Sequence, residues 1–148
     1  MLLKPRHFIR LFDNRYRDAT GERASYATVA VLPLSVGAYM PTRAPEVFLG
    51  VDYAQKLIRK HHLRYEDFVA ISELIDDSYC IKEKPNHLTF MGYRRGKGEA
   101  FILVLKAAKA GSETWVVTLH RSNSAQISGK LRRHRPSLIR DLRQEFEE

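Results

Sequence analysis

A threonine and a histidine two residues apart, Thr118 and His120, are the residues of this chain best placed to do chemistry. They end the segment 114–121, in which residue types alternate as they do along a β-strand. Alternation predicts that a hydroxyl and an imidazole share one face beside a solvent-filled cleft, where an imidazole of ordinary pKa about 6.5 can give or take a proton. The alternative is a half-exposed strand whose polar side chains simply contact water. The same alternation assigns to the core face Trp115, Val117, Leu119 and Arg121.

A second histidine, His61, ends the apolar stripe of a predicted helix over residues 52–62. The residues Ala54, Leu57 and Ile58 recur there at helical spacing, and His61 is the next member of the stripe. The spacing therefore predicts that His61 points inward, toward whatever Leu57 packs on. The alternative is a core histidine whose nitrogens are satisfied by hydrogen bonds and which has no role in chemistry.

Two other kinds of site find no support in the sequence. The adjacent residues His61 and His62 cannot bind one metal ion from the same helical face, and no further ligand follows at helical spacing, so we expect neither a metal nor a cofactor. The glycine-bearing segment 95–98 is too short for a phosphate-binding loop and is predicted to join two strands. The single cysteine, Cys80, excludes an internal disulfide and lies in an apolar context typical of a buried residue.

The elements that must position the two histidines are a helical hairpin and an antiparallel β-meander. The helices are predicted over 52–62 and 65–76, and the strands over 79–82, 87–94, 99–107 and 113–121. A short helix after Ser122 or Ser124 and a last helix from Ser137 complete the pattern. Before the hairpin, only residues 26–32 read as a possible strand.

Positive charge is concentrated in two parts of this 148-residue chain, whose formal net charge is +8. Such fields attract polyanions, nucleic acids above all, although a solvated basic face without a partner would look the same. No apolar run is long enough for a signal peptide or a membrane span, so we expect a soluble cytoplasmic protein without membrane partners. The basic residues of the two parts are Lys82, Lys84, Arg94, Arg95 and Lys97, then Arg121, Lys130, Arg132, Arg133, Arg135, Arg140 and Arg143.

Together these pieces resemble the superfamily of metal-independent ribonucleases that includes barnase, EndoU, the colicins and RelE, most closely its phage-borne branch. The resemblance covers roughly residues 47–135, and its motifs are short. They are Ile58–His61, which closes the first helix, the second helix over 65–77 leading to Cys80 and Ile81, the apolar strand Phe101–Leu105, and Val116–Arg121.

The resemblance implies an α+β fold in which N-terminal helices pack on a four- or five-stranded antiparallel sheet, with a C-terminal helix. Residues 1–46 would then be an N-terminal extension with a possible strand, and residues 47–148 the nuclease-type domain. It also implies RNA cleavage without a metal or a cofactor, in a toxin or phage effector that an immunity or antitoxin protein would control.

By position, the resemblance implies that His61 and His120 share the proton transfers, although many relatives have an aromatic residue near the place of His120. Thr118 would bind the scissile phosphate, and Arg121 would hold the charge that develops on it. Substrate-binding roles would fall to Arg94 or Lys97 for the phosphate, to Tyr93 or His87 for a base, and to Lys130, Arg132 and Arg133. Two alternatives stay open: a non-catalytic nucleic-acid-binding module, and a protein-interaction domain whose nuclease site has decayed.

Overall fold

Seven strands form one mixed sheet in the computed structural model, which describes residues 25–40, 44–94, 98–108 and 113–141. The strand order is β1-β2-β6-β5-β4-β3-β7, and all neighbours are antiparallel except β2 and β6. The helix label α2 belongs to a single turn, Leu34–Gly37. The strands are β1 (Tyr26–Val31), β2 (Glu46–Gly50), β3 (Tyr79–Lys84), β4 (His87–Tyr93), β5 (Ala100–Ala107), β6 (Thr114–Ser122) and β7 (Leu138–Arg140).

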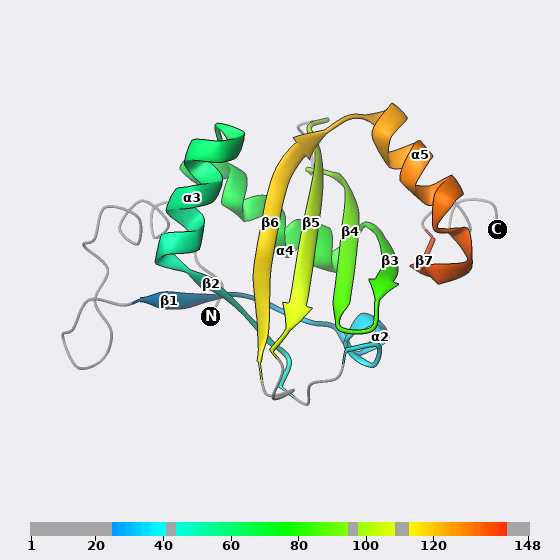
Figure 1. The fold of residues 1–148 in the computed structure, drawn as a ribbon, viewed down its shortest axis with the longest axis horizontal. Coiled ribbons are helices and arrows are strands. Elements are labelled where there is room, and N and C mark those ends of the chain that lie inside the picture. Colours follow the sequence, from blue (N-terminus) through cyan, green and yellow to red (C-terminus); the bar gives the residue numbers. More distant parts are fainter. Residues whose placement is uncertain (1–24, 41–43, 95–97, 109–112, 142–148) are drawn as a thin grey trace.

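Helices cover both faces of this sheet. On one face, α3 (Val51–His61) packs against β2 and β6, and α4 (Ala70–Asp76), preceded by the 3-10 turn Tyr65–Val69, packs against β1, β4 and β5. Figure 1 shows α4 behind the strands. On the other face, α5 (Ser124–Arg133) places Ile127 and Leu131 in a second apolar cluster with side chains of β3, β4 and β5. The 3-10 turn Arg135–Ser137 then leads into β7.

The four- or five-stranded antiparallel sheet expected from the resemblance is wrong, because strands from both ends of the described chain join the meander. β2 inserts between β1 and β6 and runs parallel to β6, which makes the sheet mixed. The side chains of Val29 and Val47, from β1 and β2, are buried in the same core as Phe90 and Phe101 of the meander. The fold class remains α+β, but the sheet is wider than expected.

The helix expected from Ser137 is also wrong where the structure describes it, since Leu138–Arg140 forms β7 beside β3. The Arg140 guanidinium explains the difference. It donates hydrogen bonds to the carbonyl oxygens of Leu74 (2.9 Å) and Ile75 (2.9 Å) at the end of α4, and to that of Ser78 (2.5 Å). Carbonyls in the last turn of a helix have no hydrogen-bond partner within the helix. When the Arg140 side chain donates to those of α4, the backbone around Arg140 lies extended beside β3.

Replacing Arg140 with alanine is expected to destabilise the fold by about 2 to 4 kcal/mol, because several partly buried carbonyls would lose a charged donor at once. Urea denaturation followed by circular dichroism measures this effect. The matched control is Arg132→Ala, which removes an exposed arginine of α5 and should change stability by less than about 0.5 kcal/mol. Equal stability of the two variants would contradict the capping role.

A β-bulge in β6 changes which of its side chains face the core. Leu105 pairs with Val116 but Val104 pairs with Thr118, so Val117 is an extra residue. Before the bulge, Thr114 and Val116 are therefore buried, and Trp115 lies on the opposite face and is only partly buried. The strict alternation predicted for this strand is wrong on that point. After the bulge, Leu119 returns to the core face.

Candidate active site

The structure brings His61 and His120 together. Their ring centroids are 5.3 Å apart and their planes are inclined by 38°. His61 is the last residue of α3, and His120 lies near the end of β6. The two meet because β2 pairs with β6 only as far as Phe48 opposite Trp115, so that α3 can lie along the remaining edge of β6 (Figure 1).

A backbone hydrogen bond sets the protonation pattern of His120. Its Nδ1 lies 3.0 Å from the carbonyl oxygen of Arg121. A carbonyl can only accept, so Nδ1 carries a proton and donates it to this bond. In the neutral ring, Nε2 is then the nitrogen with the free lone pair, and in the charged ring it is the nitrogen whose proton can be given away.

The pKa of His61 is lowered from its usual value. Partial burial contributes most, because it disfavours the charged ring, and the positive charges of His120, Lys60 and His62 lower the pKa further. His61 is therefore neutral at pH 7, and a neutral imidazole can accept a proton. Of the two rings, His61 is the one whose surroundings favour the role of a base.

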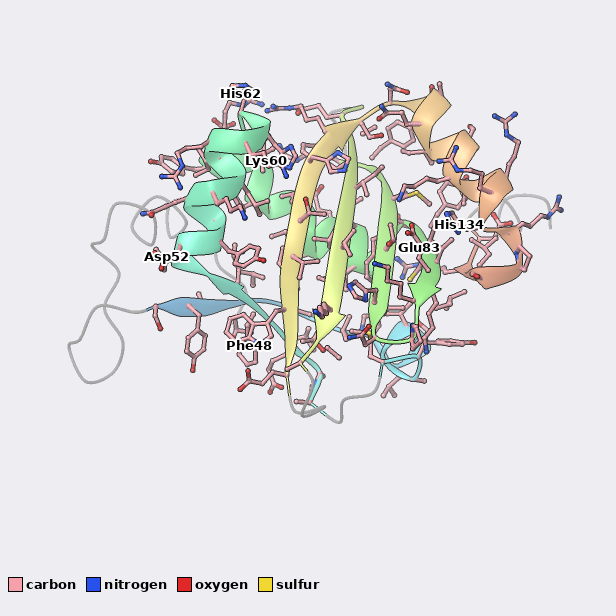
Figure 2. All side chains as sticks on the ribbon, in the orientation of Figure 1. Phe48, Asp52, Lys60, His62, Glu83 and His134 are labelled. Atoms are coloured by element: carbon pink, nitrogen blue, oxygen red, sulfur yellow. The ribbon has the colours of Figure 1, made fainter. Side chains whose placement is uncertain are left out.

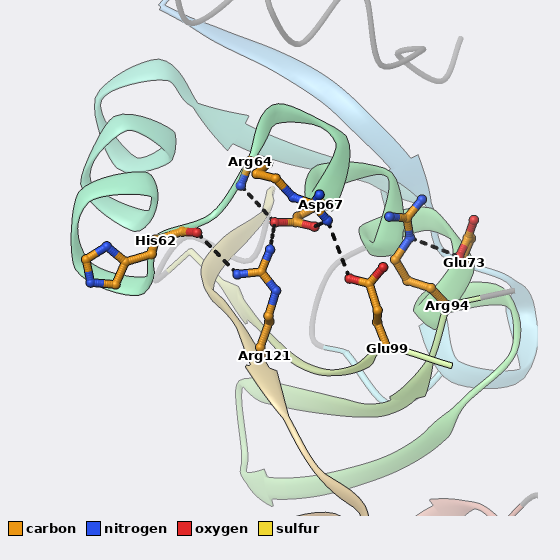
Figure 3. Close-up of polar contacts among 7 residues, drawn as sticks. All are labelled: His62, Arg64, Asp67, Glu73, Arg94, Glu99 and Arg121. Atoms are coloured by element: carbon orange, nitrogen blue, oxygen red, sulfur yellow. Dashed lines mark hydrogen bonds and ion pairs between the residues drawn. The ribbon is translucent and has the colours of Figure 1, made fainter. Parts of the chain in front are cut away.

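The pair is held in place by a clamp of Arg121 and Asp67, shown in Figure 3. The guanidinium of Arg121 donates Nη2–H to the carboxylate of Asp67 and Nη1–H to the carbonyl oxygen of His62, at 3.2 Å. His62 ends α3 in the left-handed conformation (φ 53°), and Asp67, which is fully buried, also accepts the Arg64 backbone N–H at 2.7 Å. The clamp thus ties the end of the helix that carries His61 to the strand that carries His120.

The clamp continues through Arg64, which lies 3.6 Å from Asp67 and 3.7 Å from Glu99, and Figure 3 also shows a separate ion pair of Arg94. Arg94 forms an ion pair with Glu73 of α4 at 3.9 Å and is only 11% exposed. It therefore faces α4 rather than the histidine pair, and Arg121, with Asp67 as partner, is likewise engaged. Neither arginine is brought to His120 as an unpaired cation. Lys97, the alternative to Arg94, lies outside the described residues.

Cations reach His120 from α5 instead. A pocket of about 310 Å³ is lined by His120 and Ile102 of the sheet and by Lys130 and Arg133 of the helix. Lys130 is oriented by the carboxylate of Glu83, which accepts its Nζ–H at 2.9 Å. Burial alone would raise the pKa of the Glu83 carboxyl, but the hydrogen bond and charge of Lys130, helped by the charge of His134, lower it overall. Figure 2 labels Glu83 and His134, which lie together beside α5.

The other residues expected at the site lie at different distances from the pair. Thr118 is two residues before His120 on the same face of β6 and is partly exposed. Tyr93, 45% exposed, lines a neighbouring pocket of about 390 Å³ together with Arg121. Arg132 is exposed on α5 and is not among the residues that line the pocket of His120.

His87 lies away from the pair, although it is on the same face of the sheet. It pairs with Lys106 of β5 whereas His120 pairs with Ile102, four residues along that strand, which corresponds to about 13 Å. Its Nδ1 is 2.8 Å from the side-chain oxygen of Asn86, and burial followed by the charges of Lys84 and Lys106 lowers its pKa.

Two residues that matter here were missed in the sequence. By its local sequence Asp67 is only a favourable charge in the first turn of a helix, yet it anchors Arg121 from a fully buried position. Glu83 is by its sequence only a lone acid among basic residues, yet it orients Lys130. A local signal for Asp67 exists, because a carboxylate at the third position of a turn can accept the N–H of the residue before the turn, here Arg64. Its pairing with Arg121, 54 residues away, has no such signal.

Among the described residues, the structure contains no group of three or more His, Cys, Asp or Glu side chains that could hold a metal ion, and no helix long and apolar enough to cross a membrane. The candidate site brings together two adjoining imidazoles, a partly exposed hydroxyl and two cations from α5. Comparison of the chain with protein-family models, with curated proteins and with solved structures found no match.

Proposed function

We propose that this protein is a metal-independent RNA endonuclease that cleaves by attack of a ribose 2′-hydroxyl on the adjacent phosphate. The observation that carries the proposal is the 5.3 Å separation of the His61 and His120 rings beside a pocket lined by Lys130 and Arg133. One imidazole to remove a proton, another to supply one, and cations to stabilise the phosphorane are the groups that this reaction needs.

In the proposed reaction, His61 takes the proton of the 2′-hydroxyl as its oxygen forms a bond to phosphorus. The bond from phosphorus to the 5′-oxygen then breaks, and His120 Nε2 gives that oxygen its proton. The products are a 2′,3′-cyclic phosphate and a 5′-hydroxyl. A centroid distance of 5.3 Å is too short to admit a phosphate between the ring faces, so the scissile group would contact the nitrogen edges of both rings.

In this proposal Lys130 and Arg133 stabilise the developing negative charge. The resemblance had implied that Arg121, with Arg94 or Lys97, would have this role. The position of both cations at the pocket of His120 supports the change. Lys130 is itself paired with Glu83, so Arg133, which is exposed, is the cation of this pocket proposed to meet the phosphate most directly. Thr118 remains the proposed hydroxyl contact to the phosphate. Control by an immunity or antitoxin protein that covers the pocket remains a prediction as well.

The test is cleavage of a mixed-sequence RNA by the full chain in the presence of EDTA, with the product ends identified by mass spectrometry. We expect 2′,3′-cyclic phosphate ends, and no cleavage of DNA, which lacks the nucleophile. RNA that is bound but stays intact would instead support a non-catalytic nucleic-acid-binding module. Cleavage that needs a divalent metal would contradict the proposed mechanism.

The pH dependence of cleavage is expected to follow the lowered pKa of His61. A general base must be neutral, so kcat/KM should hold down to about pH 6.5, the ordinary pKa of histidine, and fall only below it. Lys60→Gln removes one of the charges that lower the pKa of His61, so the acidic limb of the profile should move to higher pH, by a small amount because Lys60 is exposed and its charge is screened. Lys56→Gln on the same helix is the control, and an equal shift in both variants would contradict this assignment.

A further inference from the structure

Three aromatic rings meet on the face of the sheet that carries His120. Tyr26 of β1, Phe48 of β2 and Trp115 of β6 have ring centroids 5.4 to 5.6 Å apart in every pairing. Tyr26 is 50% exposed, the other two are partly exposed, and none of the three belongs to either apolar core cluster of the described residues. We call these three residues the aromatic platform.

Strand register places the platform and the histidine pair on one surface. Trp115 pairs with Lys106 and His120 pairs with Ile102, and these two β5 residues are an even number of positions apart, so their side chains share a face. Phe48 lies directly opposite Trp115 on the neighbouring strand. Because Val117 is a bulge residue, Trp115 and His120 are four β5 positions apart along the sheet, which corresponds to about 13 Å.

The platform lies beyond the helix that covers the rest of this face. The apolar cluster of α5 includes Ile81, Met91 and Ile102, which belong to β3, β4 and β5. Figure 1 shows α5 at the end of the molecule away from β1 and β2, and Figure 2 labels Phe48 far from His134. Thr118, between the platform and His120, is also partly exposed.

We infer that the aromatic platform stacks the bases of single-stranded RNA and so guides the strand to the histidine pair. The inference deepens the proposed function, on which it rests for the identity of the substrate. Aromatic rings at the surface of a sheet stack unpaired bases of any sequence. The three rings are inclined to one another by 47° to 86°, so each would stack a separate base on its free side instead of forming one flat surface. The positive net charge and Lys106 beside Trp115 attract the phosphates between the bases. The distance to His120 suits about four nucleotides stacked at roughly 3.4 Å each.

Charge favours RNA over a protein as the occupant of this surface. The Nε1–H of Trp115 donates to the Glu113 carboxylate at 2.9 Å, which would repel a phosphate at that edge of the ring, so the phosphates are expected on the side of Lys106. A chain of net charge +8 attracts a polyanion more strongly than it attracts a second copy of itself.

The test uses the fluorescence of Trp115, which is the only tryptophan of the chain. The probe is an eight-nucleotide single-stranded RNA that contains all four bases and carries 2′-O-methyl groups, so that the full protein cannot cleave it. We expect saturable quenching, with a Kd at least five-fold weaker in Tyr26→Leu and in Phe48→Leu, because leucine keeps apolar contact but has no aromatic face. The matched control is Tyr39→Leu, at a tyrosine that is 47% exposed and outside the platform.

The outcomes separate this inference from the proposed function. Quenching that both leucine variants lose supports the platform, even if unmodified RNA is never cleaved and the nuclease proposal fails. Normal cleavage with unchanged Kd values in both variants overturns the platform and leaves the nuclease proposal standing. Absence of quenching by the RNA also overturns the platform. A fluorescence change that depends on protein concentration and not on RNA overturns it as well, because it would show that two copies of the chain pair through this face.

Discussion

Replacing His120 with alanine is expected to lower the rate of RNA cleavage by about 10²- to 10⁴-fold, the usual contribution of a positioned general acid or base. Stability should change little, because the ring is partly exposed and its hydrogen bond goes to the neighbouring Arg121 carbonyl. Single-turnover cleavage measures the rate, and thermal unfolding measures stability. The same loss is expected for His61→Gln, which keeps a polar side chain of similar size without a titratable ring.

The double variant sharpens this prediction. If His61 and His120 act in one reaction, the double variant should cleave RNA scarcely more slowly than either single variant, because a base without its acid partner contributes little to the rate. The control is His87→Gln, at a histidine on the same face but about 13 Å along the sheet, and it should cleave at nearly the normal rate. A His120→Ala protein that cleaves as fast as the natural one would end the nuclease proposal in this form.

Replacing Arg121 with methionine is expected to destabilise the fold by about 2 to 3 kcal/mol and to lower cleavage together with stability. The carboxylate of Asp67 is fully buried, and without Arg121 it would keep the Arg64 N–H and an ion pair with the Arg64 side chain at 3.6 Å. Leaving a buried charge without its main partner costs about 3 to 5 kcal/mol, and the 39% exposure of the Arg121 side chain reduces that figure here. Urea denaturation and single-turnover cleavage measure the two effects.

Asp67→Asn distinguishes a positioning role of Arg121 from direct contact with phosphate. If Arg121 acts by holding α3 against β6, the asparagine variant should also lose cleavage, because the clamp weakens while the positive charge stays. If Arg121 instead bound the phosphate directly, freeing it from Asp67 should preserve or increase cleavage. Combining Arg121→Met with Asp67→Asn should recover part of the lost stability, since no buried charge is left unpaired.

Local patterns predicted the helices and strands of the central region well. The helix that ends at His61 and the four strands of the meander all form, and for the helix and the first three strands the apolar pattern matches the burial in the core. In β6 the strand forms as predicted, but the bulge reverses the face of its first residues. His61 does end a stripe that packs inward, with Ala54 and Leu57 buried. The two histidines were selected from spacing and residue type alone.

Long-range pairing was not predictable in the same way. β2 pairs with β6 although more than 60 positions separate Val47 from Thr114, and β7 pairs with β3 where the side chain of Arg140 caps α4. Neither arrangement leaves a local trace in the sequence. The bulge at Val117 is a further case, since it arises from the register of β5 against β6 and turns Trp115 away from the core.

The sequence by itself determined which side chains are available: two imidazoles at the ends of two regular elements, and an excess of basic residues. Only the tertiary structure decided which of them work together. It paired Arg121, Arg94 and Lys130 with acids, brought Lys130 and Arg133 to the pocket of His120, and assembled the aromatic platform from three strands. The physical reason is that periodicity reports the burial of each element separately, whereas ion pairs, pockets and ring clusters depend on contacts between elements that are distant in the chain.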